Sequence, residues 1–336
     1  MLAVGRRVVC GREDCGNGIS SSDRCAEPIE DVRQMGMAGE ARMGRETGEA
    51  ARTNQAAIDS VAVCEICPHA CRLREGQRGR CKARIAQNGR VVCENYGRVT
   101  AAALDPIEKK PLVRFMPGSF VLSVGSYGCN LGCPFCQNAS IAAVGAEKSS
   151  WREVSPEELV ADAVRLRDRG NVGIAFTYNE PLVGFEYVRD TARLAHEAGL
   201  VNVLVTNGMV NPGPLAELLP LIDAANVDLK GFSQGFYDFV GGDLEAVRAT
   251  IRAMAACETC HMEVTTLIVP GMNDSEEEVD ALSAWLASLD PEIPYHVSRF
   301  FPCHRLLDRG PTPVRTVYHL AEVARRHLRH VYTGNC

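Results

Sequence analysis

The chain has 336 residues, of which 46% are hydrophobic and 23% are charged, and its formal net charge is −6. This length can bury a full core, and the composition is ordinary for a globular protein. The basic residues are scattered and the net charge is negative, so the sequence offers no surface of the kind that binds nucleic acid. No apolar run approaches the roughly 20 residues that span a bilayer, and no signal peptide follows Arg6 and Arg7. We therefore expect a cytoplasmic protein that binds neither nucleic acid nor a membrane.

The fifteen cysteines are many for a chain of this length. In a cytoplasmic protein, cysteines at CxxC spacing indicate metal binding rather than disulfides. The first three, Cys10, Cys15 and Cys25, are irregularly spaced in a segment without a sustained apolar period. We expect residues 1–58 to be a disordered extension, with a redox or metal-binding tail as the alternative.

Residues 59–115 hold a second group of cysteines, three in the motif CEICPHAC and a fourth further along the chain. Its members are Cys64, Cys67, Cys71 and Cys81. A CxxC pair joined by two further cysteines fits a four-thiolate site, for zinc or for a second Fe–S cluster. His69 is a candidate substitute ligand, and a set of reduced buried thiols is the alternative without metal. Cys93 stands apart in a strand-like run and is expected in the core.

The stretch DPIEKKPL at residues 105–112 carries two prolines and four charged residues. By composition alone it predicts a solvated turn at the end of the cysteine-rich unit.

From Ser119 onward, short apolar strands alternate with amphipathic helices. Strands are predicted at 120–124, 172–177, 201–206, 224–229, 261–269 and 295–300. Helices are predicted at 156–170, 182–198, 215–219, 234–255, 276–289 and 316–328. A capping box at Ser155 and the run Asn273-Asp274-Ser275 mark two of the helix starts.

This alternation predicts right-handed βαβ units and a parallel sheet. The fold class is therefore α/β, a partial (β/α)6 TIM-type barrel over residues 116–310, preceded by the small cysteine-rich unit. Residues 311–336 add a C-terminal helix. We expect the sequence to stop short of the natural C-terminus, with Cys336 beginning another metal-binding pair.

The first strand of the barrel runs into the glycine-rich loop GCNLGCPFC, which places Cys129, Cys133 and Cys136 at CxxxCxxC spacing. Fe–S clusters are normally held by four cysteines, so three leave one iron open to a substrate or cofactor. Gly128 and Gly132 let the backbone fold tightly round a bulky cluster. The sequence therefore predicts a cluster with an open position, and a zinc site is the alternative.

Polar residues follow the ends of the later strands, where function collects in barrels of this kind. The second to fifth strands end in TYNEP, TNG, DLKG and PGMND, and a histidine lies in the sixth. The residues singled out are Glu180, Asn207, Asp228, Lys230 and His296. Each motif alone is weak evidence for a site. Because all of them lie at the ends of successive strands, we expect one shared site.

With these motifs assembled, the chain resembles the radical S-adenosylmethionine (SAM) enzymes of the pyruvate formate-lyase activating enzyme type. Within them it is most similar to the AmmeMemoRadiSam system radical SAM enzyme. The resemblance covers roughly residues 61 to 335. It rests on CEICPHACRL (64–73), DPIEKKPL (105–112), GCNLGCPFCQN (128–138), TYNEP (177–181), TNG (206–208), VDLKGF (227–232) and TLIVPGMNDS (266–275).

The resemblance implies that Cys129, Cys133 and Cys136 ligate a [4Fe–4S] cluster whose fourth iron is chelated by SAM. It also implies that Phe135 lies against the adenine and that Glu180 is a candidate for binding the SAM ammonium group. Tyr178-Asn179-Glu180 stands in the place of the family's Gly-Gly-Glu, so the charge is kept while the backbone contact differs. The remaining residues implied to line the SAM pocket are Asn207, Asp228, Lys230 and His296.

The resemblance implies a radical SAM oxidoreductase, which cleaves SAM reductively to a 5′-deoxyadenosyl radical that abstracts hydrogen from a substrate. A flavodoxin or ferredoxin-type protein would supply the electron. The substrate would be a protein glycine in a glycyl-radical enzyme, whereas the narrower family's name points to an AMMECR-like or Memo-like protein or a small molecule. Two alternatives stay open: an Fe–S electron carrier that binds no SAM, and a zinc-ribbon interaction module built on residues 64–81.

Overall fold

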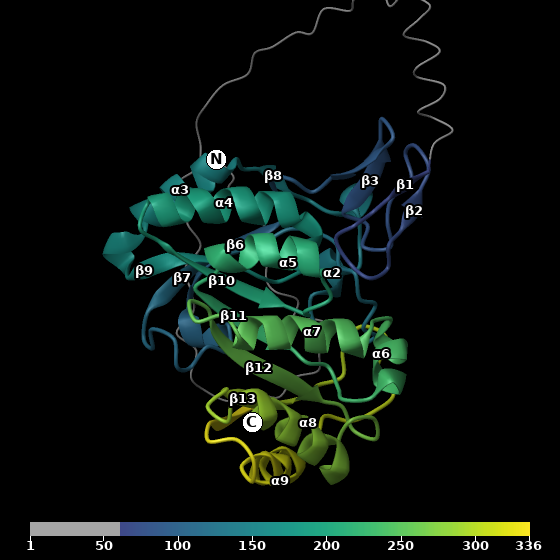
Figure 1. Cartoon of the computed structure of the whole chain (residues 1–336), viewed down its shortest axis with the longest axis vertical. Helices are drawn as coiled ribbons and strands as arrows, with labels where there is room; N and C mark the ends of the chain where they lie inside the picture. Colours follow the sequence, from purple (N-terminus) through teal and green to yellow (C-terminus); the bar gives the residue numbers. More distant parts are fainter. Residues whose placement is uncertain (1–60) are drawn as a thin grey trace, which may run out of the picture.

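The computed structural model describes residues 61–336. The expectations for residues 1–58, including Cys10, Cys15 and Cys25, lie outside the described residues. Figure 1 shows the helices following one another along the central sheet in chain order, with the cysteine-rich strands beside one end of it. Within residues 61–336, no helix combines the length and the apolar character needed to cross a membrane.

Eight strands form one sheet, in the order β14-β13-β12-β11-β10-β9-β7-β6. Their bounds are β6 Ala101–Pro106, β7 Phe120–Gly125, β9 Asn171–Phe176, β10 Val201–Thr206, β11 Ala224–Asp228, β12 His261–Ile268, β13 Tyr295–Arg299 and β14 Val331–Gly334. Neighbours are parallel throughout except for β6, which is antiparallel to β7. The predicted α/β class and the mostly parallel sheet of a partial barrel are confirmed. The edge strands β6 and β14 were not predicted.

The helices cover the sheet and connect its parallel strands. Their bounds are α2 Ala139–Ala142, α3 Pro156–Arg165, α4 Phe185–Glu197, α5 Pro212–Leu218, α6 Gln234–Val240, α7 Leu244–Ala255, α8 Glu276–Leu289 and α9 Val314–Ala324. Short 3-10 helices lie at Ile107–Lys109, Ala146–Lys148, Arg167–Arg169, Pro181–Gly184 and Leu219–Leu221. The capping box at Ser155 is present, and Ser275 caps α8.

The predicted helix over 234–255 is wrong, because the chain forms two helices there. Gly241 ends α6 with a φ of +73°, a left-handed conformation that glycine adopts without strain. Asp243 then begins α7 by accepting hydrogen bonds from two backbone N–H groups of its first turn. The apolar pattern continues across the break, which is why periodicity alone joined the two helices.

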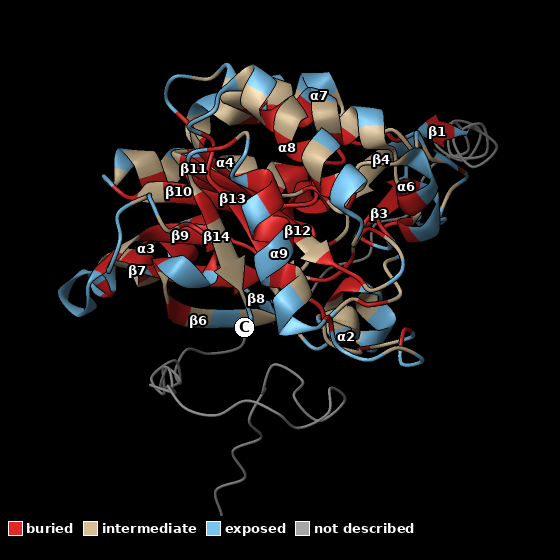
Figure 2. Cartoon of the chain, turned by 90° about the horizontal axis from the view of Figure 1, so that it is seen from below, coloured by how far each residue is buried: buried red, intermediate tan, exposed pale blue. Residues whose placement is uncertain are grey.

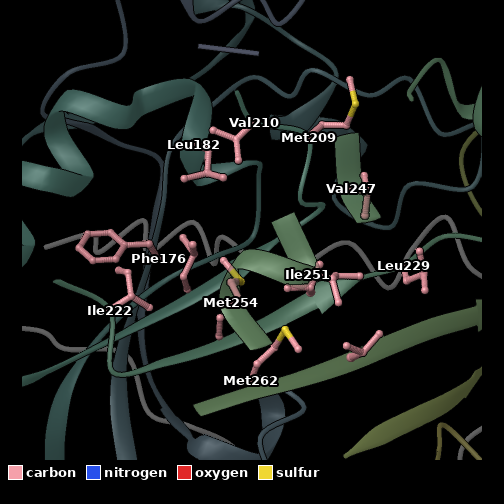
Figure 3. Close-up of a cluster of buried hydrophobic side chains, with 14 of the residues drawn as sticks. Phe176, Leu182, Met209, Val210, Ile222, Leu229, Val247, Ile251, Met254 and Met262 are labelled. Atoms are coloured by element: carbon pink, nitrogen blue, oxygen red, sulfur yellow. The ribbon is translucent and has the colours of Figure 1, made fainter. Parts of the chain in front are cut away.

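The face of the sheet that meets the helices is mainly apolar, although the buried Asn202 there hydrogen bonds the Ala192 carbonyl of α4 at 2.8 Å. Leu122, Ile174 and Leu204 are buried there, and α7 places Met254 beside Met262 of β12 (Figure 3). Figure 2 shows the inner strands of the sheet mostly buried, the edge strands β6 and β14 partly exposed, and the outer sides of the helices exposed. This face supplies the main core and orients the strand ends.

The opposite, inner face of the sheet carries small and polar residues. Ser123, Ala175, Val203 and Ala224 lie in register across four strands. Side chains from residues 107–115 pack against this row, so the segment closes the inner face near the start of the strands.

The expectation of a solvated turn at residues 105–112 is therefore wrong. Ile107 and Leu112 are fully buried, and Lys110 is only 3% exposed. The Lys110 ammonium lies 2.8 Å from Asp105, which also accepts a hydrogen bond from the Tyr178 hydroxyl at 2.7 Å. Charged residues and prolines usually indicate a solvated segment. Here the segment packs on the inner face of the sheet, which buries part of it.

The cysteine-rich unit consists of short antiparallel pairs. Their bounds are β1 Ala62–Val63 with β2 Arg72–Leu73, and β3 Arg84–Gln87 with β4 Arg90–Cys93. The next strand, β5 Arg98–Val99, pairs with β8 Arg152–Glu153, which lies outside the unit, between α2 and α3. The buried Arg84 joins the unit to α4 through a bidentate pair with Glu186, at 2.6 and 2.7 Å. Cys93 is half-buried at the end of β4.

Candidate functional site

The loop that follows β7 is shaped by its contact with the cysteine-rich unit. Gly128 has a φ of +90°, and a Cβ there would lie 2.5 Å from the carbonyl oxygen of Cys81. Glycine is therefore required at this position by both conformation and space. Gly132 is different, because a Cβ there would lie 3.9 Å from its nearest neighbour, the Val240 carbonyl oxygen.

The three cysteines of this loop are brought close to one another as reduced thiols. Cys129, Cys133 and Cys136 form no disulfide. Burial raises the pKa of each thiol, to about 11 for Cys133, and the neighbouring thiols raise that of Cys129 further. With raised pKa values, these thiols stay protonated in the protein alone. They lose the proton on binding a soft metal, because the thiolate is the form that ligates iron.

Hydrogen-bond donors point at the Cys129 sulfur. The backbone N–H of Leu131 lies 3.4 Å from it and the side-chain amide of Asn207 lies 3.6 Å from it. Donors at a cysteine sulfur stabilise a metal-bound thiolate and tune a bound cluster. In the described part of the chain, no group of three or more His, Cys, Asp or Glu side chains is arranged to hold a single metal ion.

Asp228 and Lys230, both predicted site residues, lie next to the cysteine loop. The Lys230 ammonium is 2.8 Å from Asp228, and its charge lowers the pKa of both Cys133 and Cys136. Burial lowers the pKa of Lys230 itself, but the charges of Asp228 and Cys133 outweigh burial and hold it above its usual value. A cation beside two thiols favours their thiolate forms.

Glu180 lies 2% exposed beneath the loop and joins two strand ends. Its carboxylate accepts hydrogen bonds from the Thr206 hydroxyl at 2.7 Å, from the Asn207 N–H at 2.8 Å and from the Leu182 N–H at 3.1 Å. Burial raises the pKa of Glu180 to about 7, against the lowering effect of these donors. The carboxylate therefore organises the segment that carries Asn207.

The residues just before Glu180 shape the same loop. Asn179 donates to the Gly128 carbonyl oxygen at 3.0 Å and accepts from the Ser126 N–H at 2.9 Å. Tyr178 has a φ of +71°, in the left-handed region, and directs its hydroxyl to Asp105. The Tyr-Asn pair that replaces Gly-Gly thus has its own contacts.

His296 lies on the inner face of the sheet, in register with Thr265, which is itself in register with Asp228. Its Nε2 lies 2.6 Å from Glu263, and its ring stacks on Tyr332. The sequence reasoning missed Glu263, although an acidic residue inside the apolar strand HMEVTTLI was a usable signal. A contact between His296 and SAM stays a prediction.

Phe135 is buried among three phenylalanine rings. The centroids of Phe236, Phe239 and Phe300 lie 6.2, 6.4 and 6.4 Å from its own. The ring thus anchors the cysteine loop to α6 and to the end of β13, while its predicted contact with adenine is not tested.

The cysteines at 64–81 lie in the β1–β2 hairpin of the cysteine-rich unit and in the segment after it. Cys64 and Cys71 face each other across a hairpin, with the Cys64 N–H 3.0 Å from the Cys71 carbonyl oxygen. The Cys71 sulfur accepts from the Arg80 N–H at 3.5 Å, and burial raises the pKa of Cys81 to about 11.

His69 joins the two cysteine loops. Its Nε2 lies 2.8 Å from the carbonyl oxygen of Asn130, in the other cysteine loop. Its candidate role as a substitute ligand stays a prediction.

The chain is similar to proteins of one superfamily. The profile of the Radical SAM superfamily matches residues 123–285. The uncharacterized protein MJ0808 of Methanocaldococcus jannaschii is 39% identical over 279 residues, which are 82% of each chain. The pyruvate formate-lyase-activating enzyme of Clostridium pasteurianum is 26% identical over 179 residues, covering 50% of this chain and 72% of that enzyme.

Two further similarities are more distant. The benzylsuccinate synthase activating enzyme of Thauera aromatica is 25% identical over 198 residues, 58% of each chain. The crystal structure of Streptococcus suis SuiB bound to S-adenosylmethionine superposes with a TM-score of 0.50 at 12% identity. It covers 64% of this chain and 52% of that one, and it supports the fold alone.

Proposed function

Because the chain belongs to the Radical SAM superfamily, whose members use a [4Fe–4S] cluster and SAM, we propose that it is a SAM-cleaving oxidoreductase. Cys129, Cys133 and Cys136 are the proposed cluster ligands. The observation that supports this most directly is the placement of three half-buried thiols, none in a disulfide, on one loop beside the Asp228–Lys230 pair.

The residues present fit a cluster of this kind. Three thiols leave one iron without a protein ligand, and N–H donors from Leu131 and Asn207 face the first sulfur. When bound, the cluster supplies the electron that cleaves SAM, and through it the abstraction of hydrogen from a substrate.

The chain's own residues have distinct proposed parts in this site. Lys230 offsets negative charge on Cys133 and Cys136, and Asp228 holds the Lys230 ammonium in place. Glu180 orients the backbone of Asn207, and its remaining acceptor capacity is offered to the SAM ammonium group. The other residues proposed to contact SAM are Phe135, Asn207, Asp228, Lys230 and His296.

We also propose that the cysteine-rich unit holds a second metal centre. The support is that Cys64 and Cys71 face each other across the hairpin, that both act on the pKa of Cys67, and that the Arg80 N–H faces the Cys71 sulfur. The four proposed ligands are Cys64, Cys67, Cys71 and Cys81. Zinc and a second Fe–S cluster are separated by measuring iron, sulfide and zinc in protein purified without oxygen.

The proposed substrate is a protein glycine. The relatives from Clostridium pasteurianum and Thauera aromatica are named as activating enzymes, of pyruvate formate-lyase and of benzylsuccinate synthase. A glycyl-radical enzyme is the matching partner, an AMMECR-like or Memo-like protein is the alternative, and a flavodoxin or ferredoxin-type protein would supply the electron. Incubation with each candidate followed by electron paramagnetic resonance tests for a glycyl radical.

The test of the proposed function is the release of 5′-deoxyadenosine. The protein is reconstituted with iron and sulfide without oxygen, and SAM and dithionite are added. We expect release by the wild-type protein and by Cys257→Ala, since Cys257 precedes β12 at the opposite end of the parallel strands. Cys133→Ala should abolish release.

Two results would contradict the proposal. Undiminished release by Cys133→Ala would remove this loop from the chemistry. No release by a wild-type protein that holds a reducible cluster would favour the Fe–S electron carrier.

A further inference from the structure

The two cysteine groups, separated in sequence, are in direct contact in the fold. The Cys129 N–H donates to the Cys81 carbonyl oxygen at 3.1 Å. The Asn211 N–H, just before α5, donates to the Ile66 carbonyl oxygen at 2.9 Å. The cysteine-rich unit therefore contacts both the cysteine loop of the barrel and the segment that follows β10.

Asn130, the residue after Cys129, lies between the two groups and is only 1% exposed. Its carbonyl oxygen is 2.8 Å from His69 Nε2, and because a carbonyl can only accept, the histidine donates. Its side chain donates to the Met209 carbonyl oxygen at 2.7 Å and accepts from the Asn207 amide at 2.9 Å. The Asn130 side chain also hydrogen bonds the Cys67 thiol.

Asn207 has every polar atom of its side chain engaged. Its Oδ1 accepts from the Met209 N–H at 2.9 Å, and its Nδ2 donates to Asn130 and faces the Cys129 sulfur at 3.6 Å. Its backbone N–H is held by Glu180. The amide can therefore present its N–H to Cys129 in only one orientation, and Asn130 sets that orientation.

We propose that His69 is a positioning residue for the cysteine loop: its hydrogen bond fixes Asn130, which holds the Asn207 amide against the Cys129 sulfur. These hydrogen bonds connect the cysteine-rich unit to a ligand of the proposed cluster. The effect on the cluster's reduction potential rests on the proposed function. An N–H donor at a cluster sulfur stabilises the more electron-rich reduced state, so losing it lowers the reduction potential. His69 thus sets how readily the cluster is reduced.

The experiment compares three variants. His69→Leu removes the donor, and His69→Gln keeps an N–H donor on a flexible side chain. The matched control is His327→Leu, which removes another partly buried histidine whose Nε2 bonds Asp280 on α8 at 2.8 Å. Circular dichroism and thermal unfolding establish that each variant is folded.

The first readout needs no cluster. In protein freed of metal, alkylation of Cys129 is followed by mass spectrometry of its peptide, since exposure of a thiol governs its reaction rate. We expect a several-fold faster reaction in His69→Leu, and rates near wild type in His69→Gln and His327→Leu.

The second readout is the midpoint potential of the reconstituted cluster. We expect a more negative potential in His69→Leu, with partial recovery in His69→Gln and none of this change in His327→Leu. Unchanged alkylation and potential in a folded His69→Leu variant would overturn the inference. If the wild-type protein binds no cluster, the proposed function fails, and the alkylation result decides the positioning role by itself.

Discussion

Replacing Asp105 by asparagine should destabilise the protein strongly, because it removes the carboxylate that contacts a buried ammonium. Lys110 is 3% exposed and its Nζ lies 2.8 Å from the Asp105 carboxylate. Removing one partner of a buried pair costs about 3–5 kcal/mol. At about 2 °C per kcal/mol, the value for the larger single domains, the unfolding temperature of Asp105→Asn should fall by about 6–10 °C.

Lys109 provides the matched control within the same motif. Its ammonium lies 3.4 Å from Asp105 but its side chain is 57% exposed. An exposed pair of this kind contributes up to about 1 kcal/mol, so Lys109→Met should shift the unfolding temperature by about 2 °C or less. Urea unfolding of both variants, followed by circular dichroism, converts the midpoints into free energies.

A double variant tests the physical cause. In Asp105→Asn/Lys110→Met the buried ammonium is removed together with the carboxylate it contacts, so part of the stability lost in Asp105→Asn should return. Equal losses in Asp105→Asn and Lys109→Met, or no recovery in the double variant, would show that water screens the Lys110 charge. The reasoning from burial would then be refuted.

Three further changes probe the sheet and its caps. Burial raises the pKa of Glu263, but hydrogen-bond donors including His296 outweigh burial and lower the pKa to about 2. The ionised Glu263 carboxylate therefore stabilises the protein fully above about pH 4.3, and this contribution is lost as the pH falls through about 2. Glu263→Gln should therefore flatten the fall of urea midpoints between pH 5 and pH 2, and an unchanged slope would contradict it. Gly173→Ala puts a Cβ into the Val201 carbonyl of the neighbouring strand and should cost at least about 1–3 kcal/mol in urea unfolding, whereas a neutral result would mean the strands separate freely. Ser155→Ala removes the hydroxyl that accepts from the Glu158 N–H in the capping box and should cost about 1 kcal/mol by the same assay, with no loss expected if the cap is made by water.

Features encoded within a few neighbouring residues could be predicted from the sequence. The strand at Val201–Thr206 has the predicted bounds, and Ser155 and Ser275 cap the helices that they were expected to cap. The CxxxCxxC spacing identified the loop that the superfamily profile covers. Apolar runs, caps and ligand spacing are local, so a single sequence carries them completely.

The tertiary structure alone decided which polar residues are buried and what they contact. Lys110 is charged and flanked by proline, and only the inner face of the sheet makes it a buried ion-pair partner. Asn130 and His69 are 61 positions apart, and their hydrogen bond exists because the cysteine-rich unit packs on the loop after β7. The physical reason is that a side chain's burial and partners depend on elements distant in sequence, whose approach no local pattern specifies.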